Sequence, residues 1–373
     1  MQLLPLEYAV RNLGRSRLRL FMSLFGSAAV VLLVTAAFAF VRGMEHSLVS
    51  SGSPNNVMLV GTGSEESVER SEISASTPGQ VAASVRGIRE RLGIPFVSPE
   101  VHMALTPTPT PDEESEAQVV FRGVEPVAFL VHPQVRITEG RCFDPAADEL
   151  IVGALAATRL GVPDKSLAVG NSLWLEGREW RIAGRFEAPG TVMEAEIWCP
   201  LVNLQILTRR ESLSSVVVTM DERDFAAVES FALSRLDLEL APIRETDYYR
   251  KLADFYGPIR MMVWVTVGLI GLGGILGGLN TMYAAFAARA REVGTLQSLG
   301  YSRAAVVISF VQESVLIAMA GGLIGAAVGV LVLDGLAVRI SMGAFAMAVD
   351  PTVAAVAVAV GIVLGAVGAL PPT

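Results

Sequence analysis

The chain has 373 residues, 52% of them apolar, and its mean hydropathy is +0.50. Only 18% of its residues are charged, whereas a soluble domain carries about 25%, so the composition indicates a membrane protein. The net charge of −8 argues against a nucleic-acid-binding protein, because such a protein would be basic.

Four stretches are long and apolar enough to cross a bilayer, which needs about 20 residues. They are residues 20–41, 259–288, 304–333 and 351–373. The first also resembles a signal peptide, with an Ala-Phe-Ala triplet as its cleavage site. Its apolar core exceeds the usual length of about 7–15 residues, so we interpret it as a retained span. The chain stops at Thr373 without a basic tail, which leaves open whether it continues.

Basic residues predict the orientation of the spans, because Arg and Lys near span ends stay in the cytoplasm. Two groups flank the spans: Arg11, Arg15, Arg17 and Arg19 before the first, and Arg289, Arg291 and Arg303 between the second and the third. We therefore expect a multi-pass membrane protein with both termini in the cytoplasm. Residues 1–19 form an amphipathic cytoplasmic helix in this topology, and the 334–350 loop lies outside.

The large segment between the first two spans, residues 43–257, is predicted to be a mixed α/β domain. The start of this domain is predicted to form a strand followed by a helix, and its end a strand, a helix and a strand. Asp221 is a candidate N-cap of the helix near the end. We expect these units to pair as one subdomain, formed by residues 50–135 and 211–250, with residues 136–210 as a β-rich insertion. The predicted fold class is thus a membrane protein with four transmembrane α-helices and a large α/β extracytoplasmic domain between the first and the second.

Both cysteines, Cys142 and Cys199, lie in this domain. In an oxidising compartment they could form a disulfide. The alternative is a pair of buried apolar thiols. The sequence leaves both open, because it does not place the two Cα atoms at bonding distance.

The sequence contains no catalytic constellation. The three histidines, His46, His102 and His132, lack the spacing of metal ligands, so we expect surface or loop positions for them. Lys165 follows Asp164 instead of the glycine that a phosphate-binding loop requires. We therefore predict that the chain is not itself an enzyme and has no catalytic, cofactor-binding or metal-binding residues.

The polar segment between the second and third spans, residues 289–303, predicts a short cytoplasmic helix of about 15 Å. Val293, Leu296 and Leu299 recur every three residues and are expected to form one apolar stripe.

The C-terminal end of this segment carries two helix boundary signals. Gly300 suits the left-handed position that ends a helix, and Ser302 can cap the helix that follows. A helix attached in this way to two spans moves when they move. The alternative is a turn that lies on the bilayer surface, anchored by Arg289 and Arg291. The residues alone leave both interpretations open.

The same segment carries a resemblance to a known family. Residues 291–303, REVGTLQSLGYSR, are followed by a span with an early Glu313 and by AGGLIGAAVGV, and they resemble the ABC transporter permeases of the MacB/FtsX/LolC type. Residues 6–31 are similar to the N-terminal helix and first span of that family, and residues 139–162 resemble part of its extracytoplasmic core domain. The similar stretches follow the family's order over most of the chain, without a fused ATPase domain.

The resemblance implies mechanotransmission. Two permeases, identical or mixed, assemble with two ATPase subunits, and those subunits bind the ATP and Mg while this chain binds no cofactor. The cytoplasmic helix docks on the ATPase, and the ATP cycle drives movements of the exported domain. The coupling positions carried over from the family are Arg291, Glu292, Val293, Gly294, Leu296, Leu299 and Gly300.

The function that the resemblance favours is export or extrusion of a substrate from the outer face of the inner membrane. Extraction of lipoproteins is the alternative within the family. A non-transporting regulator of an exported cell-wall hydrolase is the alternative from another class, and the large exported domain argues against it. Further expected partners are a periplasmic adaptor or a lipoprotein, and membrane lipid, but no nucleic acid.

Glycines in the second span predict a helix-packing face, because small residues let helices approach closely in lipid. They are Gly268, Gly271, Gly273, Gly274, Gly277 and Gly278, with two pairs at G-x-x-x-G spacing. The face lies either between two permeases or within one protomer.

Glu313 is an intramembrane carboxylate, ten residues after Arg303. A charge at such depth costs about 3 kcal/mol, so we expect it to face protein, with Gln312 as its partner. Its role is either a polar contact at a hinge of the span bundle or a structural one.

Overall fold

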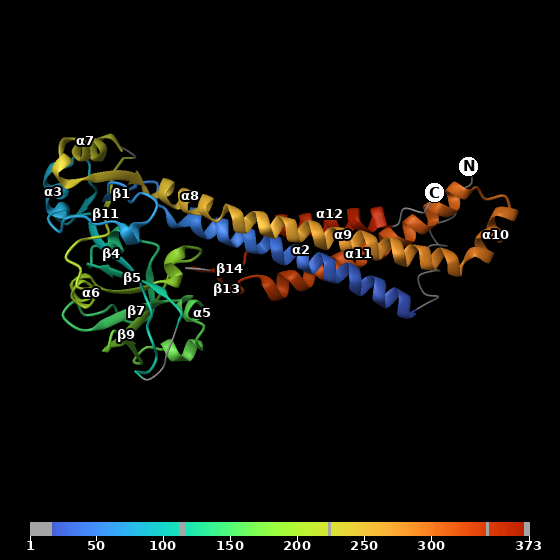
Figure 1. Cartoon of the computed structure of the whole chain (residues 1–373), viewed down its shortest axis with the longest axis horizontal. Helices are drawn as coiled ribbons and strands as arrows, with labels where there is room; N and C mark the ends of the chain where they lie inside the picture. Colours follow the sequence, from blue (N-terminus) through green and yellow to red (C-terminus); the bar gives the residue numbers. More distant parts are fainter. Residues whose placement is uncertain (1–16, 112–115, 223–224, 341–342, 369–373) are drawn as a thin grey trace. The chain divides into compact units, whose positions relative to one another are not determined.

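The computed structural model describes residues 17–111, 116–222, 225–340 and 343–368 (Figure 1). The chain divides into two compact units. The helical unit comprises Met1–Arg42, Gly257–Leu336 and Met347–Thr373, and the sheet unit comprises Gly43–Tyr256 and Ala337–Ala346. Residues 1–16 of the expected amphipathic helix, and residues 369–373 of the expected last span, lie outside the described part of the chain.

Four helices are long and apolar enough to cross a membrane, judged on the described residues. They are α2 (Arg17–Ser51), α9 (Gly257–Ala288), α11 (Arg303–Leu333) and α12 (Pro351–Gly368). A shorter helix, α10 (Ala290–Ser298), joins α9 to α11, and α12 packs on both of these spans. Large apolar side chains such as Leu269 and Leu331 are exposed on the spans, as expected for helices that contact lipid.

Glycines of α11 bring α11 and α2 into close contact. A Cβ added at Gly321 would lie 2.8 Å from the carbonyl oxygen of Leu24, and one added at Gly325 would meet the carbonyl group of Ala28. Small residues permit this approach, which provides van der Waals contact where lipid offers no hydrophobic driving force. These glycines were not among the predicted packing residues.

A ten-stranded sheet organises the sheet unit, with the strand order β12-β1-β11-β4-β5-β10-β7-β9-β6 and with β8 paired to β9. Its strands are β1 (Asn56–Gly61), β4 (Val97–Leu105), β5 (Val119–Val124), β6 (Arg136–Gly140), β7 (Glu149–Gly153), β8 (Ser172–Leu175), β9 (Arg178–Glu187), β10 (Ile197–Pro200), β11 (Ser215–Thr219) and β12 (Leu240–Arg244).

Short helices and turns connect these strands. The α-helices are α3 (Thr77–Ser84), α4 (Ala128–Val131), α5 (Ala156–Leu160), α6 (Leu201–Thr208), α7 (Ala226–Ser234) and α8 (Glu245–Phe255). The 3-10 turns are η1 (Val68–Arg70), η2 (Asp164–Leu167), η3 (Val192–Ala195) and η4 (Leu236–Leu238), and a small hairpin is formed by β2 (Glu90–Arg91) and β3 (Ile94–Pro95).

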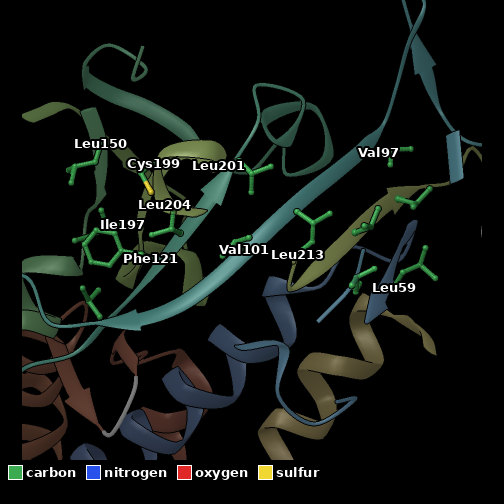
Figure 2. Packing of buried hydrophobic residues seen from close by; sticks show 14 of the residues in the cluster. Leu59, Val97, Val101, Phe121, Leu150, Ile197, Cys199, Leu201, Leu204 and Leu213 are labelled. Carbon is green, nitrogen blue, oxygen red and sulfur yellow. The ribbon is translucent and has the colours of Figure 1, made fainter. Parts of the chain in front are cut away.

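The β-rich stretch, residues 136–210, extends the sheet and does not form a separate body. Its strand β10 pairs in parallel with β5, with Ile197 opposite Phe121. One hydrophobic cluster crosses this junction, and Figure 2 shows Val101, Phe121, Ile197 and Leu150 among its members. The two groups of strands expected from the sequence are therefore neighbours in one sheet with a shared core.

Burial along the strands explains their sequences. β1, β7 and β11 are buried at every residue and are continuous apolar runs, as is typical of strands covered on both faces. β6, with the sequence RITEG, is exposed at every residue and forms an edge of the sheet, where charged side chains discourage pairing with another chain.

The connection between α11 and α12, expected only as a loop, contains a hairpin of β13 (Ala337–Ile340) and β14 (Gly343–Ala346). This hairpin belongs to the sheet unit and packs on α5 and η3. The guanidinium group of Arg339 donates a hydrogen bond to the carbonyl oxygen of Arg159 (3.4 Å). Gly161, at the end of α5, has a left-handed φ of +72°, and a Cβ there would lie 3.0 Å from the Arg339 guanidinium group.

Both cysteines are free thiols. Cys199 is buried on β10 and Cys142 is half-buried, and burial raises the pKa of each thiol. Of the two alternatives left open by the sequence, the structure shows the pair of thiols.

Candidate functional site

Helix α10 is joined almost directly to α9. Arg289 is the single residue between the two helices, and its carbonyl oxygen accepts a hydrogen bond from the Val293 amide (3.0 Å). The first turn of α10 is therefore tied to the end of α9, and little backbone freedom separates them.

The other end of α10 closes in a Schellman motif, in which the two residues after the helix bond back to its last turn. Gly300 has a φ of +92°, its amide donates to the carbonyl oxygen of Gln297 (3.1 Å), and the Tyr301 amide donates to that of Leu296 (3.1 Å). Ser302 then caps α11, because its hydroxyl accepts a hydrogen bond from the Ala305 amide (3.3 Å). The predicted boundary signals at Gly300 and Ser302 are confirmed.

The inner face of α10 packs on the two spans that flank it. Val293 is buried, and Leu296 is half-buried against the same cluster. The other members of this cluster are Met282, Phe286, Tyr301, Val306 and Phe310. The hydrophobic contact between Leu296 and Tyr301 is the one that accompanies a Schellman motif.

Leu299 does not belong to this inner face. It is 71% exposed, so the predicted stripe of three residues is wrong at its last member. The reason is geometric: at 3.6 residues per turn, each step of three residues rotates by about 60° away from the starting face. Two steps carry Leu299 about 120° from Val293, beyond the contact with the spans.

The outward face of α10 is open among the described residues. It presents Arg291, Gly294, Thr295, Ser298 and Leu299, all exposed. A Cβ added at Gly294 or at Gly300 would meet no atom within 4 Å. Of the remaining predicted coupling residues, Glu292 is half-buried and Gly300 is exposed.

An ion pair holds the start of this site to α11. The guanidinium group of Arg289 donates two hydrogen bonds to the carboxylate of Glu313, at 2.8 and 3.2 Å, and lies 5.5 Å from the centre of the Phe310 ring. Such a bidentate, charge-assisted ion pair is strong and directional. Arg289 therefore binds protein, whereas the alternative interpretation had it anchoring a turn on the bilayer surface.

Gln312 is not the partner of Glu313, so that prediction is wrong. Its amide oxygen is buried and has no hydrogen-bond partner among the described residues. The sequence could not identify Arg289, because the two partners are 24 residues apart. Arg289 is nevertheless the first basic residue after the second span, and this position was a usable signal.

The glycines of α9 differ in their surroundings. Gly278 packs against the backbone of Gly368, and Gly271 and Gly274 make ordinary contacts. Three others, Gly268, Gly273 and Gly277, would have no atom within 4 Å of an added Cβ. Part of the predicted packing face is thus unused within the described residues of one protomer. A cavity of about 460 Å³ lies among α2, α9, α11 and α12, and Gly273, Gly277 and Glu313 line it.

Two family models match most of the chain. Residues 20–231 match the MacB-like periplasmic core domain, and residues 264–373 match the FtsX-like permease C-terminal region.

Relatives agree with these matches. The ABC transporter permease YknZ of Bacillus subtilis (strain 168) is 22% identical over 334 residues, which are 84% of this chain and 81% of that protein. The macrolide export ATP-binding/permease protein MacB of Bradyrhizobium diazoefficiens is 22% identical over 346 residues, which are 87% of this chain and 52% of that protein. The chain thus spans about half the length of that MacB.

Two solved structures are similar in part. The periplasmic region of MacB from Actinobacillus actinomycetemcomitans has a TM-score of 0.40 and 10% identity, covering 55% of this chain and 94% of that one. The extracellular domain of YknZ from Gram-positive bacteria has a TM-score of 0.38 and 13% identity, covering 51% and 100%. With four apolar helices, a large α/β domain between the first two and both family regions in order, the chain belongs to the MacB/FtsX type of ABC transporter permeases.

Proposed function

We propose that this permease transmits the ATP cycle of a separate ATPase subunit to the domain between α2 and α9, and that α10 is the helix on which the ATPase docks. The observation that carries the proposal is the contrast between the two faces of α10. Its inner face and both of its ends are attached to α9 and α11. Its outward face is open among the described residues.

A helix attached in this way moves with the two spans, so a force on its outward face displaces both. This is the physical requirement for mechanical coupling. The alternative, a turn resting on lipid, does not need the Arg289–Glu313 ion pair, the Schellman motif that ends α10 or the Ser302 cap of α11.

The assembly that we propose contains two permeases, identical or mixed, and two ATPase subunits in the inner membrane. ATP and Mg bind to the ATPase subunits. Both termini of this chain are cytoplasmic, because the basic residues Arg17, Arg289, Arg291 and Arg303 then lie on the cytoplasmic side. A MacB relative carries export and ATP binding in its name, and export of a substrate from the outer membrane face is the task that we propose for this chain.

The test uses the full chain reconstituted in nanodiscs with its ATPase. Leu299→Asp places a charge on the outward face of α10, at a side chain that is 71% exposed and does not belong to the cluster between α10 and the spans. We expect it to abolish co-purification of the ATPase and the stimulation of ATP hydrolysis by the permease, with unchanged membrane insertion.

Leu236→Asp is the matched control, because Leu236 is a comparably exposed leucine (77%) in the sheet unit. It is expected to leave both readouts intact. If Leu299→Asp binds and stimulates the ATPase as the unmodified chain does, α10 is not the docking helix.

A further inference from the structure

The sheet unit buries a cluster of ionisable side chains. Its members are Glu100 on β4, His102 on β4, Arg122 on β5, His132 after α4, Glu196 before β10 and Glu245 at the start of α8. His102 lies on a buried strand, so the expectation of a surface or loop position is wrong for it. His132 lies in the loop after α4, as expected, but it is completely buried there. Burying so many charges is costly unless each one is paired, so the contacts within the cluster are informative.

Glu100 is the centre of the cluster and is completely buried. One carboxylate oxygen accepts hydrogen bonds from the Ser98 hydroxyl (2.9 Å) and from Nε2 of His132 (2.8 Å). The other oxygen accepts from Nε2 of His102 (3.1 Å) and from the guanidinium group of Arg122 (2.9 Å). Two histidines therefore share one carboxylate.

Arg122 extends the cluster across the junction in the sheet. It donates two hydrogen bonds of 2.7 Å to the carboxylate of Glu196. Arg122 lies on β5, and Glu196 directly precedes β10. The cluster thus ties together the two groups of strands that meet at the β5–β10 pair.

Glu245 connects the cluster to the two helices that continue into spans. It is the first residue of α8, and one of its carboxylate oxygens accepts from the Ser53 amide (2.8 Å) and from the side-chain amide of Asn56 (2.9 Å). Ser53 follows the end of α2 by two residues, and a Cβ added at Gly52 would lie 2.8 Å from the Cα of Thr246. Glu245 therefore marks the junction where the end of α2 touches the start of α8.

One link in this chain of contacts is open. Nδ1 of His132 lies 3.7 Å from the nearer oxygen of Glu245, beyond hydrogen-bond distance, and it has no hydrogen-bond partner among the described residues. The neighbouring contacts of the cluster measure 2.7 to 3.1 Å. A shift of less than about 1 Å at the start of α8 would bring Nδ1 and the Glu245 carboxylate into hydrogen-bond contact.

The two histidines differ in their proton affinity. Burial lowers the pKa of His132, but the Glu100 and Glu245 carboxylates outweigh burial and raise it above the ordinary value. Burial and the charge of Arg122 lower the pKa of His102. Burial raises the pKa of Glu245 in spite of His132 and its hydrogen bonds. His132 is therefore the histidine of the cluster that binds a proton more tightly than an ordinary histidine does.

We propose that His132 is a proton-sensitive latch, which binds Glu245 when it is protonated and thereby holds the junction of α2 and α8 against β4 through Glu100. The charged groups that face His132 are Glu100 from β4, Glu245 from α8 and Arg122 from β5, and the Trp198 ring of β10 lies 6.0 Å away. By linkage, a movement of α8 that closes the contact raises the proton affinity of His132, and protonation favours the closed position.

The latch is independent of the ATPase-docking role of α10, because all its atoms belong to the sheet unit. It lies next to the segment that continues into α9, since α8 ends at Phe255 and α9 begins at Gly257. It therefore makes the position of this junction respond to the pH around the domain.

The first test is an NMR titration of the full chain in nanodiscs, with isotope-labelled histidine. The chain has only three histidines, so His46→Gln, His102→Gln and His132→Gln assign every signal. We expect the pKa of His132 to lie above the ordinary histidine value and the pKa of His102 to lie below it. If His132 titrates at or below the ordinary value, the latch does not exist.

The second test asks whether α8 is part of the latch. Glu245→Gln keeps an oxygen for the Ser53 and Asn56 hydrogen bonds but removes the charge that faces His132, so it should lower the pKa of His132. Asp247→Asn is the matched control. It also removes a carboxylate from α8, but this carboxylate pairs with Arg250, outside the buried cluster. An unchanged pKa of His132 in Glu245→Gln would overturn the proposal even if every variant folds.

The third readout is the stability of the chain as a function of pH. The raised pKa of His132 contributes stability that is complete below the unfolded value of about 6.5 and is lost as pH rises through the folded pKa. His132→Gln should abolish this alkaline loss. His102 has a lowered pKa, so its contribution is lost instead as pH falls, and His102→Gln should leave the alkaline loss in place. Equal alkaline losses in the unmodified chain and in His132→Gln would contradict the latch.

Discussion

Arg289 and Glu313 hold together the two spans that flank α10. Two hydrogen bonds join them, and 10% of one side chain and 11% of the other are exposed. Removing one partner of a buried ion pair costs about 3–5 kcal/mol, whereas replacing both with apolar residues costs far less. The pair therefore stabilises the attachment of α10 to α11 only while both members are present.

Glu313→Gln and Arg289→Met are each expected to lower the free energy of unfolding by about 3 kcal/mol. The double variant Arg289→Met/Glu313→Leu should lose much less than the sum of its parts, measured by denaturant unfolding in detergent. Arg291→Met serves as the control at an exposed arginine and should change stability by less than about 0.5 kcal/mol. Strictly additive losses would show that the two side chains do not interact.

Two glycines of α10 should respond in opposite directions to alanine. Gly300 has a φ of +92°, so Gly300→Ala forces a left-handed residue and costs about 1–2 kcal/mol. Gly294 lies inside the helix with open space around it, so Gly294→Ala should gain about 0.5–1 kcal/mol. The melting temperatures of the two variants show whether each substitution stabilises or destabilises the chain. A destabilised Gly294→Ala variant would mean that the backbone of α10 contacts another group.

We predict that the missing side chain of Gly161 leaves the space that the guanidinium group of Arg339, in the β13–β14 hairpin, occupies. Gly161→Ala incurs the backbone cost of a left-handed residue and also displaces the guanidinium group, so we expect the hairpin to be cleaved faster by protease. Gly170 is the matched control, because its φ is +95° and a Cβ there meets no atom within 4 Å. Gly170→Ala should lower stability without exposing the hairpin, and equal cleavage in the two variants would refute the role of Gly161.

Glycines of α11 and α9 should also differ. Gly325→Leu is expected to separate α11 from α2 and to lower the melting temperature, because its side chain would overlap the Ala28 carbonyl group. Gly273→Leu should leave the protomer stable, since no atom lies within 4 Å of an added Cβ. If the open face of α9 joins two permeases, Gly273→Leu will instead reduce the dimer fraction in cross-linking. A harmless Gly325→Leu would contradict the observed helix contact.

Local signals were sufficient for the spans and for the boundary between α10 and α11. Length and hydropathy identify a span because lipid requires an unbroken apolar helix, and Gly300 and Ser302 act within one helical turn of their own position. The same local signal is misleading at Leu299, because a repeat of three residues predicts a helical face that does not include this exposed side chain.

Contacts between distant residues could not be read in this way. The ion pair joins residues 24 positions apart, and the burial of His132 depends on Glu100 and Glu245, which lie on other elements. The short hairpin of β13 and β14 has too few residues for a recognisable alternation, and its conformation depends on packing against α5 and η3. These features depend on tertiary structure, about which single positions carry little information.

The β13–β14 hairpin limits the motions that this permease can use. Three residues separate α11 from β13, and four separate β14 from α12. A fully extended residue spans at most about 3.6 Å, so the four steps from Leu333 to Ala337 and the five from Ala346 to Pro351 reach about 14 and 18 Å at most. While the hairpin remains seated, the ends of α11 and α12 cannot slide past it by more than this reach. A movement of α11 or α12 away from the hairpin that exceeds the extended length of these connections would require the hairpin to detach from α5 and η3 first.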